Sequence, residues 1–253
     1  MIRIIIAFTF LIVFLILSIP ILIVEWIIGL FSPQIKAKSS LAIVNWAFSV
    51  ILFMAGATTT VIGEENVPKD EAVLYILNHR SYFDILLTYV RVPRQTGYVA
   101  KKEMLYFFTL TWWMKNLHCE FMDRKDMRKG LETIKNCIKK IQNGISIAIF
   151  PEGTRNKTEE PLLEFHKGSF KIAEKANCKI VPVVLLNTSK IFEDQFPCLK
   201  KQHVIIEYLP PINVAELDKA QRRELPDVVA EQIRTTYIKN KALYEEQNAK
   251  KKS

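Results

Sequence analysis

The sequence has few glycines, and no two of them lie close together. Its 253 residues include eight glycines, and the closest pair, Gly56 and Gly63, is seven positions apart. The G-x-G-x-x-G loop, the Walker loop and the G-x-S-x-G turn all need glycines at most about five positions apart. Their absence argues against a nucleotide-binding fold of the Rossmann or P-loop type and against an ordinary serine hydrolase.

Cysteine is scarce too, and acidic residues are outnumbered by basic ones. The four cysteines form no C-x-x-C pair, which favours reduced thiols over disulfides and offers no zinc-ligand spacing. The net charge is +9, which suits anionic lipid head groups or a phosphate-bearing substrate. No zinc-finger spacing, RNP-like stretch or basic zipper region accompanies this charge, so we predict no nucleic-acid partner.

The N-terminal region contains two long apolar stretches. Residues 4–24 carry no charge and are rich in Ile, Leu and Phe, and a helix of this length spans roughly 30 Å, about the hydrocarbon thickness of a bilayer. Residues 39–63 are also uncharged but less apolar, and Trp26 lies where an interfacial aromatic residue is expected. We therefore predict an apolar helical segment that anchors the protein to a membrane over residues 1–63.

The way this segment meets the membrane stays open at the level of sequence. Two spanning helices would put the link that carries Lys36 and Lys38 on the side opposite the basic remainder of the chain, against the positive-inside tendency. A helical hairpin buried in a single leaflet avoids that conflict. A buried helix pair in a soluble core is the third interpretation.

Residues 64–253 are predicted to form a second, α/β domain. Short apolar runs predict strands at 72–77, 97–100, 120–122, 146–150, 180–186 and 204–208. Helical periodicity and flanking signals predict helices from about residue 82 and at 104–117, 126–142, 168–176 and 227–246, before a frayed lysine tail at 250–252. Alternating strands and helices indicate a mixed, largely parallel sheet flanked by helices.

A first polar cluster, containing the pattern H-x4-D, directly follows the predicted strand 72–77. In a continuous helix, five residues would separate His79 and Asp84 by about 140°. The two side chains can touch only in a strand-to-helix turn, with Asp84 in the first helical turn. That contact would orient the imidazole and stabilise its protonated form, as general-base catalysis requires. The alternative is a surface turn with a capping aspartate.

A second cluster, Phe-Pro-Glu-Gly-Thr-Arg at residues 150–155, follows another predicted strand. Ligands of parallel α/β sheets lie at the carboxyl ends of the strands. Glu152 can accept a hydrogen bond from a hydroxyl, Gly153 lets the backbone approach closely, and Arg155 presents a planar fork suited to phosphate. Two cations at the ends of other predicted strands, Lys101 and Arg124, would line the same anion-binding pocket as Arg155.

Taken in order, these motifs resemble the sequence blocks of the glycerolipid acyltransferases, most closely the lysophosphatidate acyltransferase branch. The resemblance covers about residues 67–211 and rests on four blocks: His79-x4-Asp84, Asp123-Arg124, the hexapeptide at 150–155 and Val-Pro-Val-Val at 181–184. The run before Asp123 is Cys-Glu-Phe-Met, where the family more often has a glycine and small apolar residues. That departure leaves the identity of the acceptor lipid open.

The resemblance implies a glycerol-3-phosphate acyltransferase-like fold and a reaction without metal or cofactor. His79, oriented by Asp84, would take the proton from the sn-2 hydroxyl of lysophosphatidate, which attacks the thioester of acyl-CoA or acyl-carrier protein and gives phosphatidate for phospholipid biosynthesis. The implied place is the cytoplasmic face of a bacterial inner membrane or of the endoplasmic reticulum. The substrate-binding residues carried over are Lys101, Arg124, Glu152, Gly153, Thr154 and Arg155.

Other functions remain open from the sequence. One is an acyltransferase for another lysophospholipid or lyso-lipid. A second is a membrane thioesterase or lysophospholipase that uses the same base with water, and a third is a non-catalytic lipid-binding scaffold. A cysteine nucleophile at Cys119 or Cys178 is a further alternative mechanism. The aromatic segment 104–117 would line an acyl-chain groove or pack in the core.

Overall fold

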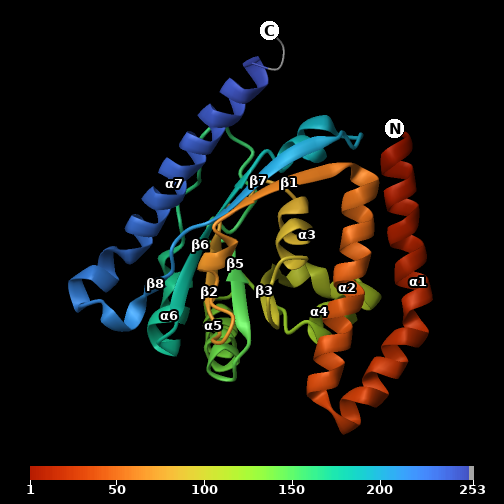
Figure 1. Cartoon of the computed structure of the whole chain (residues 1–253). Coiled ribbons are helices and arrows are strands. Elements are labelled where there is room, and N and C mark those ends of the chain that lie inside the picture. The colour runs from red at the N-terminus through yellow and green to blue at the C-terminus, as the bar shows by residue number, and fades with distance from the viewer. Residues whose placement is uncertain (251–253) are drawn as a thin grey trace.

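The computed structural model describes residues 1–250, so the rest of the lysine tail, residues 251–253, lies outside the described residues. A mixed sheet forms the middle layer, and helices cover both of its faces (Figure 1). The α-helices are α1 (Ile2–Phe31), α2 (Pro33–Ala55), α3 (Phe83–Tyr89), α4 (Phe108–Asn116), α5 (Met127–Gln142), α6 (Lys171–Ala176) and α7 (Lys219–Lys250). The strands are β1 (Ala57–Ile62), β2 (Leu74–Leu77), β3 (Thr96–Lys101), β4 (Glu120–Met122), β5 (Ser146–Ile149), β6 (Lys179–Leu186), β7 (Gln202–Tyr208) and β8 (Ile212–Asn213).

The strand order is β1-β7-β6-β2-β5-β3-β4, and β8 pairs with β6. The neighbours β6, β2, β5, β3 and β4 are all parallel, whereas β7 is antiparallel to β6. This arrangement confirms the predicted mixed, largely parallel sheet flanked by helices. Because five neighbouring strands run in one direction, the segments that follow them all leave the sheet at the same edge.

Strand β2 illustrates how the core is divided between the two faces of the sheet. All four of its residues are buried, as expected for a central parallel strand. Tyr75 and Leu77 belong to the core on the side of α1 to α4, while Leu74 and Ile76 belong to the core on the side of α5 to α7. The two-residue period of the strand therefore supplies both cores from one short apolar run.

Helices α1 and α2 form a hairpin that lies along the helical layer of α3 and α4 (Figure 1). Both are long and apolar enough to cross a membrane. The indole Nε1 of Trp113 in α4 donates to the hydroxyl of Ser18 at 2.9 Å, and the rings of Phe48 and Tyr89 lie 5.8 Å apart. The exposed side chains of α1 are mostly Ile, Leu, Val and Phe, which gives the hairpin a large apolar outer surface.

The structure departs from the predicted boundary at residue 63. Helix α2 ends at Ala55, where Gly56 takes a left-handed conformation with φ of 72°, and residues 57–62 form the edge strand β1, paired with β7. The β-branched run Thr-Thr-Thr-Val-Ile favours a strand. The hydroxyls of Thr58 and Thr60 also bond the two ring nitrogens of His203 on β7, at 3.0 and 2.9 Å. The apolar helical segment therefore ends near residue 56, and residues 57–62 belong with the sheet.

Candidate active site

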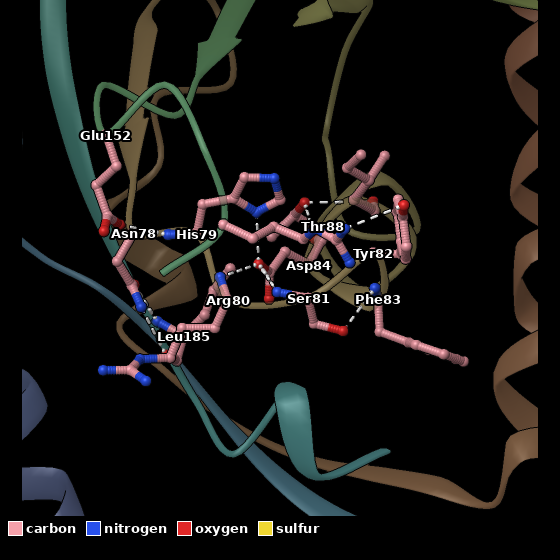
Figure 2. A network of polar contacts seen from close by, with 12 residues as sticks. Asn78, His79, Arg80, Ser81, Tyr82, Phe83, Asp84, Thr88, Glu152 and Leu185 are labelled. Atoms are coloured by element: carbon pink, nitrogen blue, oxygen red, sulfur yellow. Dashed lines mark hydrogen bonds and ion pairs between the residues drawn. The ribbon is translucent and has the colours of Figure 1, made fainter. Parts of the chain in front are cut away.

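His79 and Asp84 are in hydrogen-bond contact in the turn between β2 and α3 (Figure 2). Nδ1 of His79 lies 2.8 Å from Oδ2 of Asp84, which is in the first turn of α3 and fully buried. The same Oδ2 accepts the backbone N–H groups of Arg80 at 2.7 Å and of Ser81 at 2.8 Å. This is the strand-to-helix geometry that the H-x4-D spacing requires, and it fixes the orientation of the imidazole.

The environment of His79 leaves one ring nitrogen available. An ionised carboxylate only accepts hydrogen bonds, so this contact favours the neutral tautomer with the proton on Nδ1 and the lone pair on Nε2. Within residues 1–250, no group forms a hydrogen bond with Nε2, and the side chain of His79 is 16% exposed. The ring of Phe150 stacks on the imidazole, with centroids 4.0 Å apart and an interplanar angle of 21°. The ring is thus packed on its face and open at Nε2, as a general base requires.

Asn78 fixes the point at which the chain leaves the sheet (Figure 2). Its side-chain amide donates to the carbonyl of Leu185 at 2.9 Å, and its side-chain oxygen accepts the N–H of Leu185 at 2.8 Å. The backbone carbonyl of the next residue, His79, accepts the N–H of Asn156 at 2.7 Å. The candidate catalytic turn, residues 78–84, is therefore bonded both to β6 and to the loop after β5.

Glu152 is buried beneath this turn, with only 4% of its surface exposed. Oε1 accepts the backbone N–H of His79 at 2.7 Å, and Oε2 accepts that of Leu163 at 2.9 Å. Burial raises the pKa of Glu152 to about 7, although these two N–H groups act in the opposite direction. Both carboxylate oxygens thus accept backbone N–H groups of the protein itself. The predicted contact of Glu152 with substrate stays a prediction.

Gly153 and Thr154 form the tip of the hexapeptide turn. Gly153 has φ of 69°, in the left-handed region that favours glycine. A Cβ at this position would lie 2.9 Å from Nε2 of His166, so only glycine lets that ring lie against the turn. The side chain of Thr154 is exposed.

Arg155 is held in place by two residues, one of which the sequence analysis missed. Nη1 donates to Oε1 of Glu193 at 3.0 Å, and Nη2 donates to the hydroxyl of Tyr82 at 3.1 Å. The guanidinium carbon also lies 3.7 Å from the centroid of the Tyr82 ring. Glu193 belongs to no recognised motif, and its one signal in the sequence is its position soon after the predicted strand 180–186.

The two other predicted cations lie at the same edge of the sheet, Lys101 as the last residue of β3 and Arg124 two residues after β4. Lys101 and Arg124 are exposed, and neither forms a hydrogen bond or ion pair with any residue that the structure describes. The guanidinium carbon of Arg124 would lie 3.9 Å from a Cβ at Gly153, which puts it beside the hexapeptide turn. Lys101 is brought to the edge but not into contact with that turn.

The two cysteines considered as nucleophiles, Cys119 and Cys178, are poorly suited to that role. Cys119, Cys137 and Cys178 are buried, and burial raises the pKa of all three thiols, to about 12 for Cys137 and Cys178. A thiol with so high a pKa is not a thiolate at neutral pH and reacts slowly. The structure therefore argues against a cysteine mechanism.

Comparison with known proteins identifies the family of the chain. Residues 58–186, about half of the chain, match the family described as Acyltransferase. The chain belongs to that family. This acyltransferase is similar to the 1-acyl-sn-glycerol-3-phosphate acyltransferase of Saccharomyces cerevisiae, with 31% identity over 188 residues that cover 74% of this chain and 62% of the yeast protein. It therefore spans about three fifths of the length of that relative.

Two further likenesses concern shorter or more distant proteins. The acyltransferase is 29% identical over 196 residues to the 1-acyl-sn-glycerol-3-phosphate acyltransferase of Borreliella burgdorferi, covering 78% of each chain. The crystal structure of the 1-acyl-sn-glycerophosphate (LPA) acyltransferase of Thermotoga maritima superposes with a TM-score of 0.82 at 21% identity, over 95% of both chains. At this identity the superposition establishes the fold, which includes the N-terminal helical hairpin.

Proposed function

We propose that this acyltransferase transfers a fatty-acyl group from acyl-CoA or acyl-carrier protein to the sn-2 hydroxyl of lysophosphatidate, which gives phosphatidate. The observation that carries the proposal is the 2.8 Å contact between His79 and the buried Asp84, with Nε2 open. The choice of acceptor is supported by the names of the yeast and Borreliella relatives.

In the proposed reaction, Nε2 of His79 removes the proton of the acceptor hydroxyl as its oxygen attacks the thioester carbonyl carbon. The new ester C–O bond forms and the C–S bond breaks, and the imidazolium returns its proton to the departing thiolate. Asp84 stabilises the imidazolium while that charge exists. No acyl-enzyme intermediate is required, because one base serves both proton transfers.

The acceptor phosphate is assigned to the cations at the same edge of the sheet. Arg155 has five N–H groups, and two of them are used by Glu193 and Tyr82. The other three have no hydrogen-bond partner among the described residues and can bind phosphate oxygens. Lys101 and Arg124, which are exposed and unpaired within residues 1–250, would add further positive charge.

The membrane is the second proposed partner. Helices α1 and α2 each contain an apolar stretch long enough to cross a membrane. They pack against α3, which begins in the catalytic turn, and against α4. Anchoring this hairpin in a bilayer would hold the active site at the surface where lysophosphatidate is found. The cytoplasmic face is proposed because acyl-CoA and acyl-carrier protein are made there.

The decisive experiment follows a labelled acyl group from acyl-CoA or acyl-carrier protein to a panel of lyso-lipids, with purified protein in detergent. We expect label in phosphatidate, lost at least 1,000-fold in His79→Ala, on the order of the effect of removing a general base. The matched control is His203→Ala, because His203 contacts β1 rather than the catalytic turn, and it should keep the activity.

Each other outcome of this assay has a distinct meaning. Label in a different phospholipid would support His79 as the base but would mean that the acceptor is another lyso-lipid. Free fatty acid as the sole product would indicate a thioesterase or lysophospholipase. Transfer by His79→Ala at the normal rate, or no reaction with either donor, would contradict the proposal.

A further inference from the structure

Glu193 connects three parts of the site that are distant in the sequence. It begins the short 3-10 helix Glu193–Gln195 in the connection between β6 and β7. Oε2 accepts the hydroxyl of Ser81 at 2.6 Å, and Oε1 accepts both the backbone N–H of Tyr82 at 2.8 Å and Nη1 of Arg155 at 3.0 Å. One carboxylate therefore joins the catalytic turn, the hexapeptide loop and its own loop.

These contacts restrict Arg155 on three sides. Glu193 holds one edge of the guanidinium, the hydroxyl of Tyr82 holds a second N–H, and the Tyr82 ring covers its face. The side chains of Glu193 and Arg155 are 16% and 23% exposed, so the ion pair is largely shielded from water. An ion pair in this setting restrains geometry much more than one on an open surface.

Restraint of this kind matters for binding a phosphate. A free arginine side chain populates many rotamers, and a ligand that must select one of them loses affinity to conformational entropy. A guanidinium that is already fixed avoids this cost and presents its remaining N–H groups in one direction. The direction is set relative to His79, because Glu193 bonds Ser81 and Tyr82 of the same turn.

We propose that Glu193 is the positioning residue of Arg155 and thereby sets the preference of the enzyme for an acceptor that carries a phosphate. This inference rests on the proposed function, since it takes the acceptor phosphate as the ligand of Arg155. Glu193 touches neither the hydroxyl that reacts nor the thioester. Its effect is on how tightly the acceptor binds and not on the chemical step.

The test measures kcat and the KM of both substrates for the wild type, Glu193→Gln, Arg155→Ala and the double variant, with lysophosphatidate and acyl-CoA. Glu193→Gln should raise the KM for lysophosphatidate about tenfold, the effect of losing one charged hydrogen bond. The kcat and the KM for acyl-CoA should stay within about twofold of wild type, since the oxygen and the NH2 group of glutamine can keep the hydrogen bonds to Tyr82 and Ser81 that hold the turn of His79. In the Arg155→Ala background, Glu193→Gln should raise the acceptor KM no further.

Two more variants guard against a purely structural effect. Asp194→Asn changes the neighbouring carboxylate, which accepts from Ser189 instead, and should leave all three kinetic constants unchanged. Glu193→Asp keeps the charge on a shorter side chain and should raise the acceptor KM less than Glu193→Gln does. Thermal melting of each variant identifies any that fails to fold.

Several results would overturn the inference. An acceptor KM that is unchanged or lower in Glu193→Gln would mean that Glu193 does not help the phosphate bind, or competes with it. A lower kcat together with higher KM values for both substrates would indicate a structural role. Additive increases of the acceptor KM in the double variant would mean that Glu193 does not act through Arg155. If the wild type transfers nothing to lysophosphatidate, the proposed function fails and this inference fails with it. If the wild type is active and Arg155→Ala raises the acceptor KM but Glu193→Gln does not, the proposed function stands and only the role of Glu193 is wrong.

Discussion

Asp84 has two tasks in the catalytic turn, and a single substitution can separate them. Its Oδ2 accepts backbone N–H groups of Arg80 and Ser81, which hold the turn, and also faces Nδ1 of His79. The side-chain oxygen of an asparagine can still accept the backbone groups. All three contacts reach the same Oδ2, so that oxygen can also accept from Nδ1 and keep the tautomer of His79. The neutral amide, however, no longer stabilises the imidazolium that forms when His79 takes a proton.

We therefore predict that Asp84→Asn lowers kcat by about 100-fold or more, because the charge beside the base is lost, while KM and the melting temperature change little. Steady-state acyl transfer and thermal melting measure the two effects, and Asp194→Asn is the matched control. Activity within tenfold of wild type would mean that the charge of Asp84 does not support His79 as a base.

Glu152 should make the stability of the protein depend on pH. Its pKa is raised from 4.5 to about 7 by burial, so the native state holds this proton more tightly than the unfolded state does. The stabilisation by protonated Glu152 is complete below about pH 4.5 and is lost as the pH rises through about 7. The shift corresponds to a free energy of unfolding on the order of 3 kcal/mol.

The matching experiment compares the melting temperatures of the wild type and Glu152→Gln between pH 5 and pH 8. The glutamine side chain of the variant cannot ionise. The melting temperature of the wild type minus that of the variant should therefore fall as the pH rises across this window. A difference that is constant, or that grows with pH, would contradict the raised pKa.

The residues at the site differ in how well sequence predicts them. The contact between His79 and Asp84 follows from their spacing, because a strand-to-helix turn is the local geometry that lets them meet. Glu193 could not be found in the same way, because its partners Ser81 and Arg155 lie 112 and 38 positions away. A contact formed only by the packing of distant loops leaves no local pattern in the sequence.

Among the helices and strands, the central strands could be predicted from local sequence, whereas the edge strand could not. Strand β2 could be predicted because its apolar run is buried on both faces of the sheet. Strand β1 was merged with the apolar helix before it, because its partner β7 lies more than 140 residues later in the chain. The predicted helix 104–117 is divided into a 3-10 helix, Lys102–Tyr106, and α4, and no residue there signals the break.

The docking of α1 on α4 depends on a buried tryptophan. Trp113 is 2% exposed, donates to Ser18 and stacks on Phe14 with centroids 6.0 Å apart. We predict that Trp113→Ala lowers the free energy of unfolding in detergent by about 3–5 kcal/mol, the usual cost of removing a large buried aromatic side chain. Denaturant titration measures the loss.

Trp26 supplies the matched control for this prediction. It lies on α1 and is 53% exposed, so Trp26→Ala should leave the stability in detergent within about 0.5 kcal/mol of wild type. It should instead weaken binding to lipid vesicles, measured by flotation, because exposed tryptophan anchors proteins at membrane interfaces. Equal losses of stability in the two variants would mean that the contact of Trp113 with α1 contributes no more to the free energy of unfolding than an exposed tryptophan does.

At the scale of the whole molecule, the parallel sheet is what assembles the site. His79 follows β2, the hexapeptide follows β5, Lys101 ends β3, Arg124 follows β4, and Glu193 follows β6. All five strands are parallel neighbours, so residues spread over more than 110 positions reach one edge. Sequence predicts this convergence from the position of each motif after a strand, but not which cations are paired and which remain free.

The same scale decides how the hairpin meets the membrane. Its contacts with the rest of the protein occur along its length: the N-terminal ammonium of Met1 lies 3.6 Å from Sγ of Cys198, Ser18 near the middle of α1 bonds Trp113, and α2 packs on α3. If the hairpin crossed the bilayer, α3, α4 and the polar loops beside them would have to enter the hydrocarbon core. That placement is costly for backbone and charged groups, so we predict that the hairpin inserts into one leaflet only.

Cysteine labelling in sealed vesicles tests this prediction. In a Cys198→Ser background, Ser32→Cys marks the hairpin link and Lys239→Cys, exposed on α7, marks the catalytic side. With a single-leaflet hairpin, a membrane-impermeant maleimide should label Ser32→Cys from the same side as Lys239→Cys or from neither side. Labelling of Ser32→Cys from the opposite side alone would require a spanning hairpin, and α1 would then have to separate from Trp113 and Cys198 on insertion.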